Sequence, residues 1–150
     1  MGYKLGMTMP AKCKAISAVV ANIPDTSNLD CVGAGKPIAV MISNGTMDQT
    51  NPYNGGVMTI NGANWGAVRS TEKSFQYWSS LAGYKGEPVV EQIPDTVKNN
   101  QTITKYSFNE KGKPAVTLLK VIGGTHTFPQ DLDIFLESWK FFKREIEREK

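Results

Sequence analysis

The chain has 150 residues, of which 40% are hydrophobic and 21% charged, and its formal net charge is +3. This length suits one domain with a core of its own and is too short for two of ordinary size. The basic residues are scattered, which argues against nucleic-acid binding, and no apolar run approaches the ~20 residues that a membrane span needs. We therefore expect one globular domain, with neither nucleic acid nor membrane among its partners.

The first ten residues predict a short helix. Met1, Leu5 and Met9 recur at helical spacing and would face the core, and Pro10 ends the run. The segment lacks the basic flank and continuous apolar stretch of a signal peptide. No N-cap precedes the helix, which favours an element that begins upstream of Met1.

The chain contains two cysteines, Cys13 and Cys31, and one histidine, His126. The cysteines could form a disulfide, stay free or pack as small apolar residues, and a count of two does not choose among these. One histidine and two separated cysteines do not make a metal-ligand set, so we expect no metal and no other cofactor. The oligomeric state is left open.

Two apolar runs predict buried strands in the first third of the chain. Residues 15–21 and 37–43 are apolar on both faces, as parallel strands covered by helices on each side are. The second run leads into a turn-rich segment, residues 44–56, which contains Asp48. Residues 57–69 have no clear period, and we expect them to be irregular.

The middle of the chain predicts a helix and then a hairpin. Ser70 is a suitable N-cap for a helix that runs to about residue 82, with a buried stripe and Gly83 as its stop. The stripe consists of Phe75, Trp78 and Leu81. Residues 86–100 are expected to be a loop. Residues 102–108 and 115–122 are predicted strands joined by a turn, most simply an antiparallel hairpin.

The end of the chain predicts an amphipathic helix capped by Asp131 or Asp133. We expect its aromatic stripe to pack in the core rather than to bind a partner or a membrane surface, because the opposite face is mixed in charge. The stripe consists of Phe135, Trp139, Phe142 and Ile146. The order of all these elements indicates an α/β fold: a mostly parallel sheet, helices on both faces and one antiparallel hairpin strand.

Asp48 and His126 each follow a predicted parallel strand. Because the carboxyl ends of such strands meet at one edge of a sheet, neighbouring strands would bring the two side chains together. A buried carboxylate that accepts from one ring nitrogen fixes the imidazole tautomer and leaves the other nitrogen free to take a proton. A lone loop histidine is usually unremarkable, and aspartate is a common turn former. Their joint placement is what favours a catalytic pair.

The sequence around this pair resembles the polyhydroxybutyrate depolymerase and feruloyl esterase family of α/β-hydrolases. The similar motifs are Gly-Thr-Met-Asp at 45–48, Asn-Pro-Tyr-Asn-Gly-Gly at 51–56 and Gly-Gly-Thr-His-Thr-Phe-Pro at 123–129. The helix with Trp78 and the closing aromatic helix fit the same pattern, so the resemblance covers essentially the whole chain. It implies that Asp48 is the acid and His126 the base of a Ser-His-Asp triad.

This resemblance implies a serine esterase that hydrolyses carboxylic esters, either polyhydroxyalkanoates or feruloylated polysaccharides, so an ester substrate, in some cases polymeric, is the expected partner. It also implies an extracellular or periplasmic location for the complete protein. Residues 1–150 would be the carboxyl-terminal portion of a single α/β-hydrolase domain. Asn44 and Phe128 stand where the family pattern has His and Trp, and Phe128 would alter the pocket wall.

One departure concerns the nucleophile. Such hydrolases carry the attacking Ser in a G-x-S-x-G turn that precedes the acid and the base, and no glycine in this chain is followed two positions later by Ser. We expect this Ser a few residues before Met1, and we expect the 150-residue chain alone to be inactive and prone to aggregation.

Two alternatives stay open. A serine peptidase or a dienelactone-type hydrolase of the same fold would place acid and base in the same way. In the other alternative, Met1 is a true start and the chain is a non-catalytic α/β binding domain.

Overall fold

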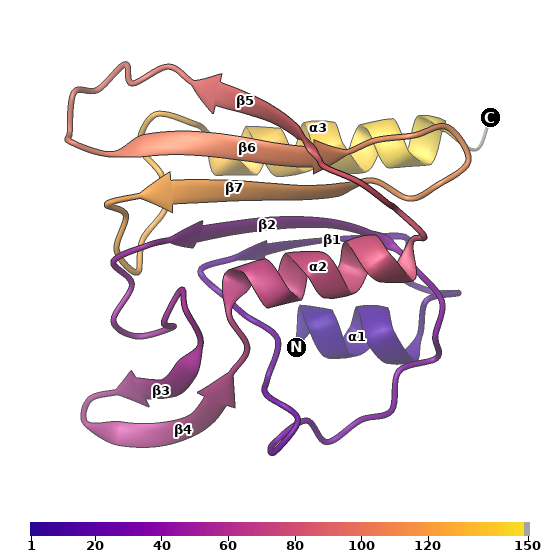
Figure 1. The fold of residues 1–150 in the computed structure, drawn as a ribbon, viewed down its shortest axis with the longest axis horizontal. Helices are drawn as coiled ribbons and strands as arrows, with labels where there is room; N and C mark the ends of the chain where they lie inside the picture. Colours follow the sequence, from indigo (N-terminus) through magenta and orange to yellow (C-terminus); the bar gives the residue numbers. More distant parts are fainter. Residues whose placement is uncertain (149–150) are drawn as a thin grey trace.

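The computed structural model describes residues 1–148, and Figure 1 shows a sheet between two layers of helices. The helices are α1 (Gly2–Thr8), α2 (Thr71–Leu81) and α3 (Ile134–Glu147). The strands are β1 (Ala15–Val19), β2 (Ala39–Gly45), β3 (Gly56–Ile60), β4 (Ala63–Val68), β5 (Val89–Ile93), β6 (Thr102–Phe108) and β7 (Val116–Ile122). Five strands form one sheet in the order β1-β2-β7-β6-β5, and β3 and β4 form a separate hairpin.

The two predicted buried strands and the strand before His126 lie side by side. β1 pairs with β2, and β2 with β7, all parallel, with Gly45 opposite Val121 near their carboxyl ends. The arrowheads of the three strands point the same way in Figure 1. β6 pairs with β7 antiparallel, as predicted for the hairpin. The α/β class is therefore confirmed, and the sheet is mixed because β6 runs against the other four strands.

The prediction of an irregular segment over residues 57–69 was wrong, because this segment forms β4 and most of β3. Asn61 and Gly62 make the turn of this hairpin with φ angles of 51° and 77°. Two successive positive φ angles are typical of the two-residue turns that join the strands of a β-hairpin. Asn-Gly is the dipeptide that favours these turns. The signal was thus present in the sequence, but the flanking strands are largely exposed and show no clean alternation.

The predicted loop over residues 86–100 also contains a strand. β5 pairs antiparallel with β6 at the edge of the sheet. Val89 and Val90 are both exposed, at 71% and 55% of their surface. Successive apolar residues that both face solvent give no period-two pattern, so this strand depends on its pairing with β6 rather than on burial.

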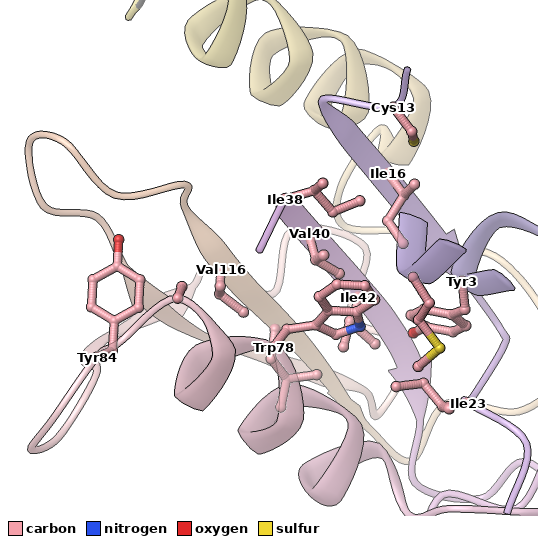
Figure 2. Packing of buried hydrophobic residues seen from close by; sticks show 13 residues of the cluster. Tyr3, Cys13, Ile16, Ile23, Ile38, Val40, Ile42, Trp78, Tyr84 and Val116 are labelled. Atoms are coloured by element: carbon pink, nitrogen blue, oxygen red, sulfur yellow. The ribbon is translucent and has the colours of Figure 1, made fainter. Parts of the chain in front are cut away.

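The larger core lies between the sheet and the helices α1 and α2. Trp78 of α2 is fully buried over Val40 and Ile42 of β2, as Figure 2 shows. The cap prediction for α2 is confirmed, because the Ser70 hydroxyl accepts from the Lys73 amide. On the opposite face of the sheet, a second core packs α3 against β2 and β7.

The prediction for the buried face of α3 was wrong. Of the four predicted stripe residues, only Phe142 is half-buried and packs against the core. Phe135, Trp139 and Ile146 are exposed at 67%, 64% and 57%, whereas Ile134 and Phe141 are buried. Asp133 is the N-cap, as one of the two predicted alternatives had it. Among residues 1–148, no helix has the length and hydrophobicity to cross a bilayer.

Polar contacts explain the rotation of α3. The Ser138 hydroxyl lies 2.8 Å from that of Ser17 on β1, and the Glu145 carboxylate accepts from the Ala115 amide at 3.2 Å. Turning the aromatic stripe inward would take the half-buried Ser138 and the buried Glu145 away from these partners, and loss of such partners is costly.

The buried face predicted for α1 was wrong in the same way. Tyr3 and Met7 are buried against the sheet, whereas Met1, Leu5 and Met9 are exposed at 102%, 42% and 40%. The Tyr3 ring stacks near Trp78 with ring centres 6.4 Å apart, and Figure 2 shows it beside that core. Burial of the Tyr3 ring against Trp78 stabilises the fold more than burial of the three flexible side chains of Met1, Leu5 and Met9 would.

Candidate active site

The structure brings Asp48 and His126 together at the carboxyl end of the sheet. Asp48 lies three residues after β2 and His126 four residues after β7. The Asp48 Oδ2 atom is 2.8 Å from Nδ1 of the His126 ring. The Asp48 side chain is fully buried, whereas 42% of the His126 side chain is exposed. The expected meeting of an acid and an imidazole at one rim of the sheet is therefore observed.

The turn after β2 fixes the Asp48 carboxylate. Its second oxygen, Oδ1, accepts hydrogen bonds from the Thr50 and Asn51 amides, both at 2.8 Å. Backbone amides that donate to a carboxylate stabilise its charged form and hold its orientation. Because Oδ1 is occupied by the turn, Oδ2 is the oxygen that remains for His126.

Two glycines allow the ends of β2 and β7 to approach each other. A Cβ atom on Gly45 would overlap the carbonyl of Gly124, so only glycine fits this approach. The Met47 amide donates to the Gly124 carbonyl at 2.8 Å, and the Thr46 hydroxyl accepts from the Gly123 amide at 2.9 Å. These bonds tie the loop that carries Asp48 directly to the loop that carries His126.

The hydrogen bond to Asp48 assigns the tautomer of the neutral His126 ring. A carboxylate can only accept, so Nδ1 carries the hydrogen and Nε2 is left with a lone pair. Nε2 makes no hydrogen bond within residues 1–148. The ring can therefore accept a proton at Nε2 while Asp48 stabilises the resulting imidazolium, which is the chemistry of a general base.

Tyr53 lies in the same turn segment as Asp48 and is buried beside charged residues. Its hydroxyl donates to Glu72 at 3.4 Å, and the Lys120 amine lies 5.1 Å from the centre of its ring. Burial raises the pKa of Tyr53, and the nearby Glu72 carboxylate raises it further. Tyr53 is therefore a neutral structural residue at physiological pH rather than a second base.

Phe128 packs against α3. Its ring packs edge-on against Phe135 of α3, with ring centres 5.1 Å apart, and 48% of Phe128 is exposed. The residue links the loop that carries His126 to the exposed aromatic face of α3.

Three buried polar side chains beneath the pair were not predicted as site residues. Asn22, Asn44 and Thr71 come from the loop after β1, the end of β2 and the start of α2, and they bond to one another. In the sequence, Asn44 stands out only as a departure from the pattern of the family that the chain resembles. No local pattern identifies such a cluster, because its members are separated by 22 and 27 residues.

Neither cysteine is oxidised, and both thiols are free. Cys13 is buried, and this burial raises the pKa of its thiol. Within residues 1–148, no three acidic, histidine or cysteine side chains gather in a way that could hold a metal ion.

A cavity of about 630 Å³ follows the outer edge of β1. α1, β1 and the loop after β1 line it, and Met58 and Trp65 of the β3–β4 hairpin also contribute. Asn51, from the turn of Asp48, reaches the same cavity. No strand within residues 1–148 pairs with this edge of β1.

Comparison with models of protein families and with curated proteins finds no match to this chain. The functional assignment therefore depends on the geometry of the site.

Proposed function

We propose that this chain carries the acid and base of a serine hydrolase that acts on carboxylic esters. The observation that carries the proposal is the 2.8 Å hydrogen bond between the buried Asp48 Oδ2 and Nδ1 of the half-exposed His126 ring. An acid after one parallel strand and a base after its neighbour, with helices on both faces of the sheet, support a partial α/β-hydrolase fold.

In the proposed mechanism, His126 Nε2 takes the proton of an attacking hydroxyl as that oxygen adds to the ester carbonyl. The same nitrogen then returns the proton to the departing alkoxide, and an acyl-enzyme results. In the second half-reaction, His126 activates water in the same way. Asp48 stays ionised and holds the ring while it is positively charged.

We infer that the attacking Ser lies outside these 150 residues. The sequence has no G-x-S-x-G turn, and a Ser on such a turn also supplies an oxyanion-hole amide. The unpaired edge of β1 and the cavity along it offer a place for a further parallel strand. A strand there would end beside β1, at the same edge of the sheet as Asp48 and His126.

The family resemblance suggests the substrates: polyhydroxyalkanoates or feruloylated polysaccharides, met outside the cell or in the periplasm by an exported enzyme. A serine peptidase or a dienelactone-type hydrolase would use the same acid and base. A panel of p-nitrophenyl butyrate, a feruloyl ester and a peptide anilide separates these classes, because each class turns over its own substrate fastest.

A non-catalytic α/β domain is the second candidate, favoured by the lack of an elbow motif in the chain. The test is to express the chain with the in-frame sequence that precedes Met1 in the genome and to treat it with a fluorophosphonate. We expect covalent labelling of one Ser, loss of labelling in its Ala variant, and at least 10³-fold slower labelling in His126→Ala.

The matched control is the 150-residue chain, which we expect to remain unlabelled. A stop codon immediately upstream of Met1, or a longer chain that folds but neither labels nor hydrolyses p-nitrophenyl butyrate, would exclude the esterase proposal and leave the binding domain.

A further inference from the structure

We propose that Asn44 is a positioning residue for the Asp48–His126 pair. Its side chain joins the exit of β1, the start of α2 and, through Asn22, the turn that carries Asp48. The catalytic meaning of this role rests on the function proposed above, whereas the structural link itself does not.

The first part of the link is a two-point bond between Asn44 and Ala21. The Asn44 Oδ1 atom accepts from the Ala21 amide at 2.9 Å, and Nδ2 donates to the Ala21 carbonyl at 3.1 Å. The side-chain amide thus pairs with the main chain as a neighbouring strand would. Val20, the residue before, has a φ of +48°, which is strained for a β-branched side chain. The bond from Asn44 holds the chain in this strained exit from β1.

The second part is a buried polar cluster. Asn44 Nδ2 lies 2.9 Å from both Asn22 Oδ1 and Thr71 Oγ1, so its two hydrogens are shared among these two oxygens and the Ala21 carbonyl. The Thr71 hydroxyl donates to Asn22 Oδ1 at 3.0 Å. The three residues are exposed by 1%, 6% and 0%, in the order Asn44, Asn22, Thr71. With so little water nearby, these bonds are strong, and removal of one donor leaves other polar groups unpaired.

The third part reaches the turn of Asp48. Asn22 Nδ2 donates to the Pro52 carbonyl at 3.2 Å, and the Thr71 amide donates to the Tyr53 carbonyl at 2.8 Å. Asp48 itself caps the beginning of the same turn through Oδ1. The beginning of the turn is therefore fixed by Asp48, and its end is fixed by the cluster that Asn44 completes.

Asn44 is chemically suited to this place because it offers an acceptor and a donor on one planar group. Leucine would fill a similar volume but would leave the Ala21 amide unpaired and the Ala21 carbonyl with only the 3.3 Å bond from the Tyr3 hydroxyl. Aspartate would set a charged oxygen against the Ala21 and Asn22 oxygens. If the end of the turn is released, the Asp48 Oδ2 atom loses its fixed distance to His126.

The test uses the fact that His126 is the only histidine in the chain. In protein labelled with ¹⁵N-histidine, the two ring nitrogens report the tautomer directly, and a hydrogen-bonded Nδ1–H gives a distinct downfield proton signal. A Trp139→Lys background removes one exposed aromatic ring of α3 and aids solubility. We expect the Nδ1–H tautomer and the downfield signal in this background, and loss of both in Asp48→Asn.

We expect Asn44→Leu and Asn22→Ala to lose the downfield signal and to shift the ring toward a mixture of tautomers. Thr71→Ser keeps the hydroxyl and should keep the signal. The matched control is Thr104→Val on β6, which removes a buried hydroxyl bonded to Gln92 Oε1 at 3.0 Å and should lower stability without changing the His126 signals.

Wild-type signals in a folded Asn44→Leu variant would overturn the proposal. If Asn44→Leu does not fold, Asn22→Ala decides in the same way. Loss of the signal in Thr104→Val as well would also overturn it, because the effect would then follow from general destabilisation. None of these results depends on esterase activity, so failure of this proposal can be told apart from failure of the proposed function. If only the proposed function fails, the bond between Asp48 and His126 is intact but the longer chain is not labelled by the fluorophosphonate.

Discussion

Asp48 divides its two carboxylate oxygens between its own turn and His126. Oδ1 accepts the Thr50 and Asn51 amides, and Oδ2 lies 2.8 Å from the ring nitrogen Nδ1. One oxygen therefore sets the orientation of the group, and the other acts on the imidazole. A substitution can remove the second role while it preserves the first.

Asp48→Asn is the change that separates these roles. If the amide oxygen keeps the position of Oδ1, the turn is retained, but the amide NH₂ then faces Nδ1 and favours the wrong tautomer. In the longer chain that carries the nucleophile, we expect kcat/KM on p-nitrophenyl butyrate to fall by about 10⁴, with a small change in thermal stability. His126→Ala should cost about as much, and the double variant little more. Activity within tenfold of the wild type would remove Asp48 from the mechanism.

Gly45→Ala tests the close approach of the loops that carry Asp48 and His126. The added Cβ would overlap the Gly124 carbonyl, so the two loops must separate, at a cost of about 1–3 kcal/mol. We expect a lower free energy of unfolding in urea and, in ¹⁵N-histidine spectra, loss of the Nδ1–H signal of His126. Gly2→Ala is the control, because a Cβ on Gly2 meets nothing within 4 Å. A stable Gly45→Ala with unchanged histidine signals would contradict this account.

The sequence predicts the pair well because its signals are local. β2 and β7 are mostly apolar, β2 ends in Gly45 and Gly123 follows β7, so both the strands and the loops can be assigned without knowledge of the fold. Placing Asp48 beside His126 then needs one further assumption, that the two strands are neighbours. The parallel pairing of β2 with β7 meets it.

The sequence fails where the answer depends on distant partners. The face of α3 that is buried is chosen by Ser17 and Ala115, which lie far from the helix along the chain. The cluster around Asn44 needs three segments at once. β5 is held by pairing with β6 at a sheet edge rather than by its own pattern. The β3–β4 hairpin, by contrast, has a local signal in its sequence, the turn dipeptide Asn61-Gly62.

Substitutions on the two faces of α3 should change the free energy of unfolding by very different amounts. Phe141 is 3% exposed in the core, and Phe141→Ala should lower the free energy of unfolding by about 3–5 kcal/mol. Phe135 is 67% exposed, and Phe135→Ala should change it by no more than about 0.5 kcal/mol. Urea unfolding followed by circular dichroism measures both values.

Substitutions on the exposed face of α3 should increase solubility, although they hardly change stability. Phe135→Ala and Trp139→Lys remove exposed aromatic surface, so we expect less self-association in analytical ultracentrifugation than for the wild type. Equal destabilisation by Phe135→Ala and Phe141→Ala would mean that the aromatic stripe is buried after all, and that α3 is rotated relative to the structure.

Asp131 provides a pH-dependent contact away from the active site. It was a candidate N-cap for α3, but Asp133 takes that place, and Asp131 instead holds the loop between β5 and β6. Its Oδ1 atom accepts from the Val97 and Thr96 amides at 2.8 Å each, and from the Thr96 hydroxyl at 3.2 Å. The Val97 amide, helped by the bonds from Thr96, lowers the pKa of the Asp131 carboxyl below its ordinary value.

A lowered pKa in the folded state means that the contact stabilises the loop at any pH above the ordinary pKa of an aspartate. This stabilisation is lost as the pH falls through the lower, folded-state pKa, because the protonated carboxyl accepts these amides poorly. We therefore expect the amide signals of Thr96 and Val97 in ¹H–¹⁵N spectra to stay constant from neutral pH down to about pH 4. Below that they should move together. In Asp131→Asn the transition should be absent. If the wild-type amides instead move together above pH 4, or do not move at all in acid, Asp131 does not hold this loop as a carboxylate.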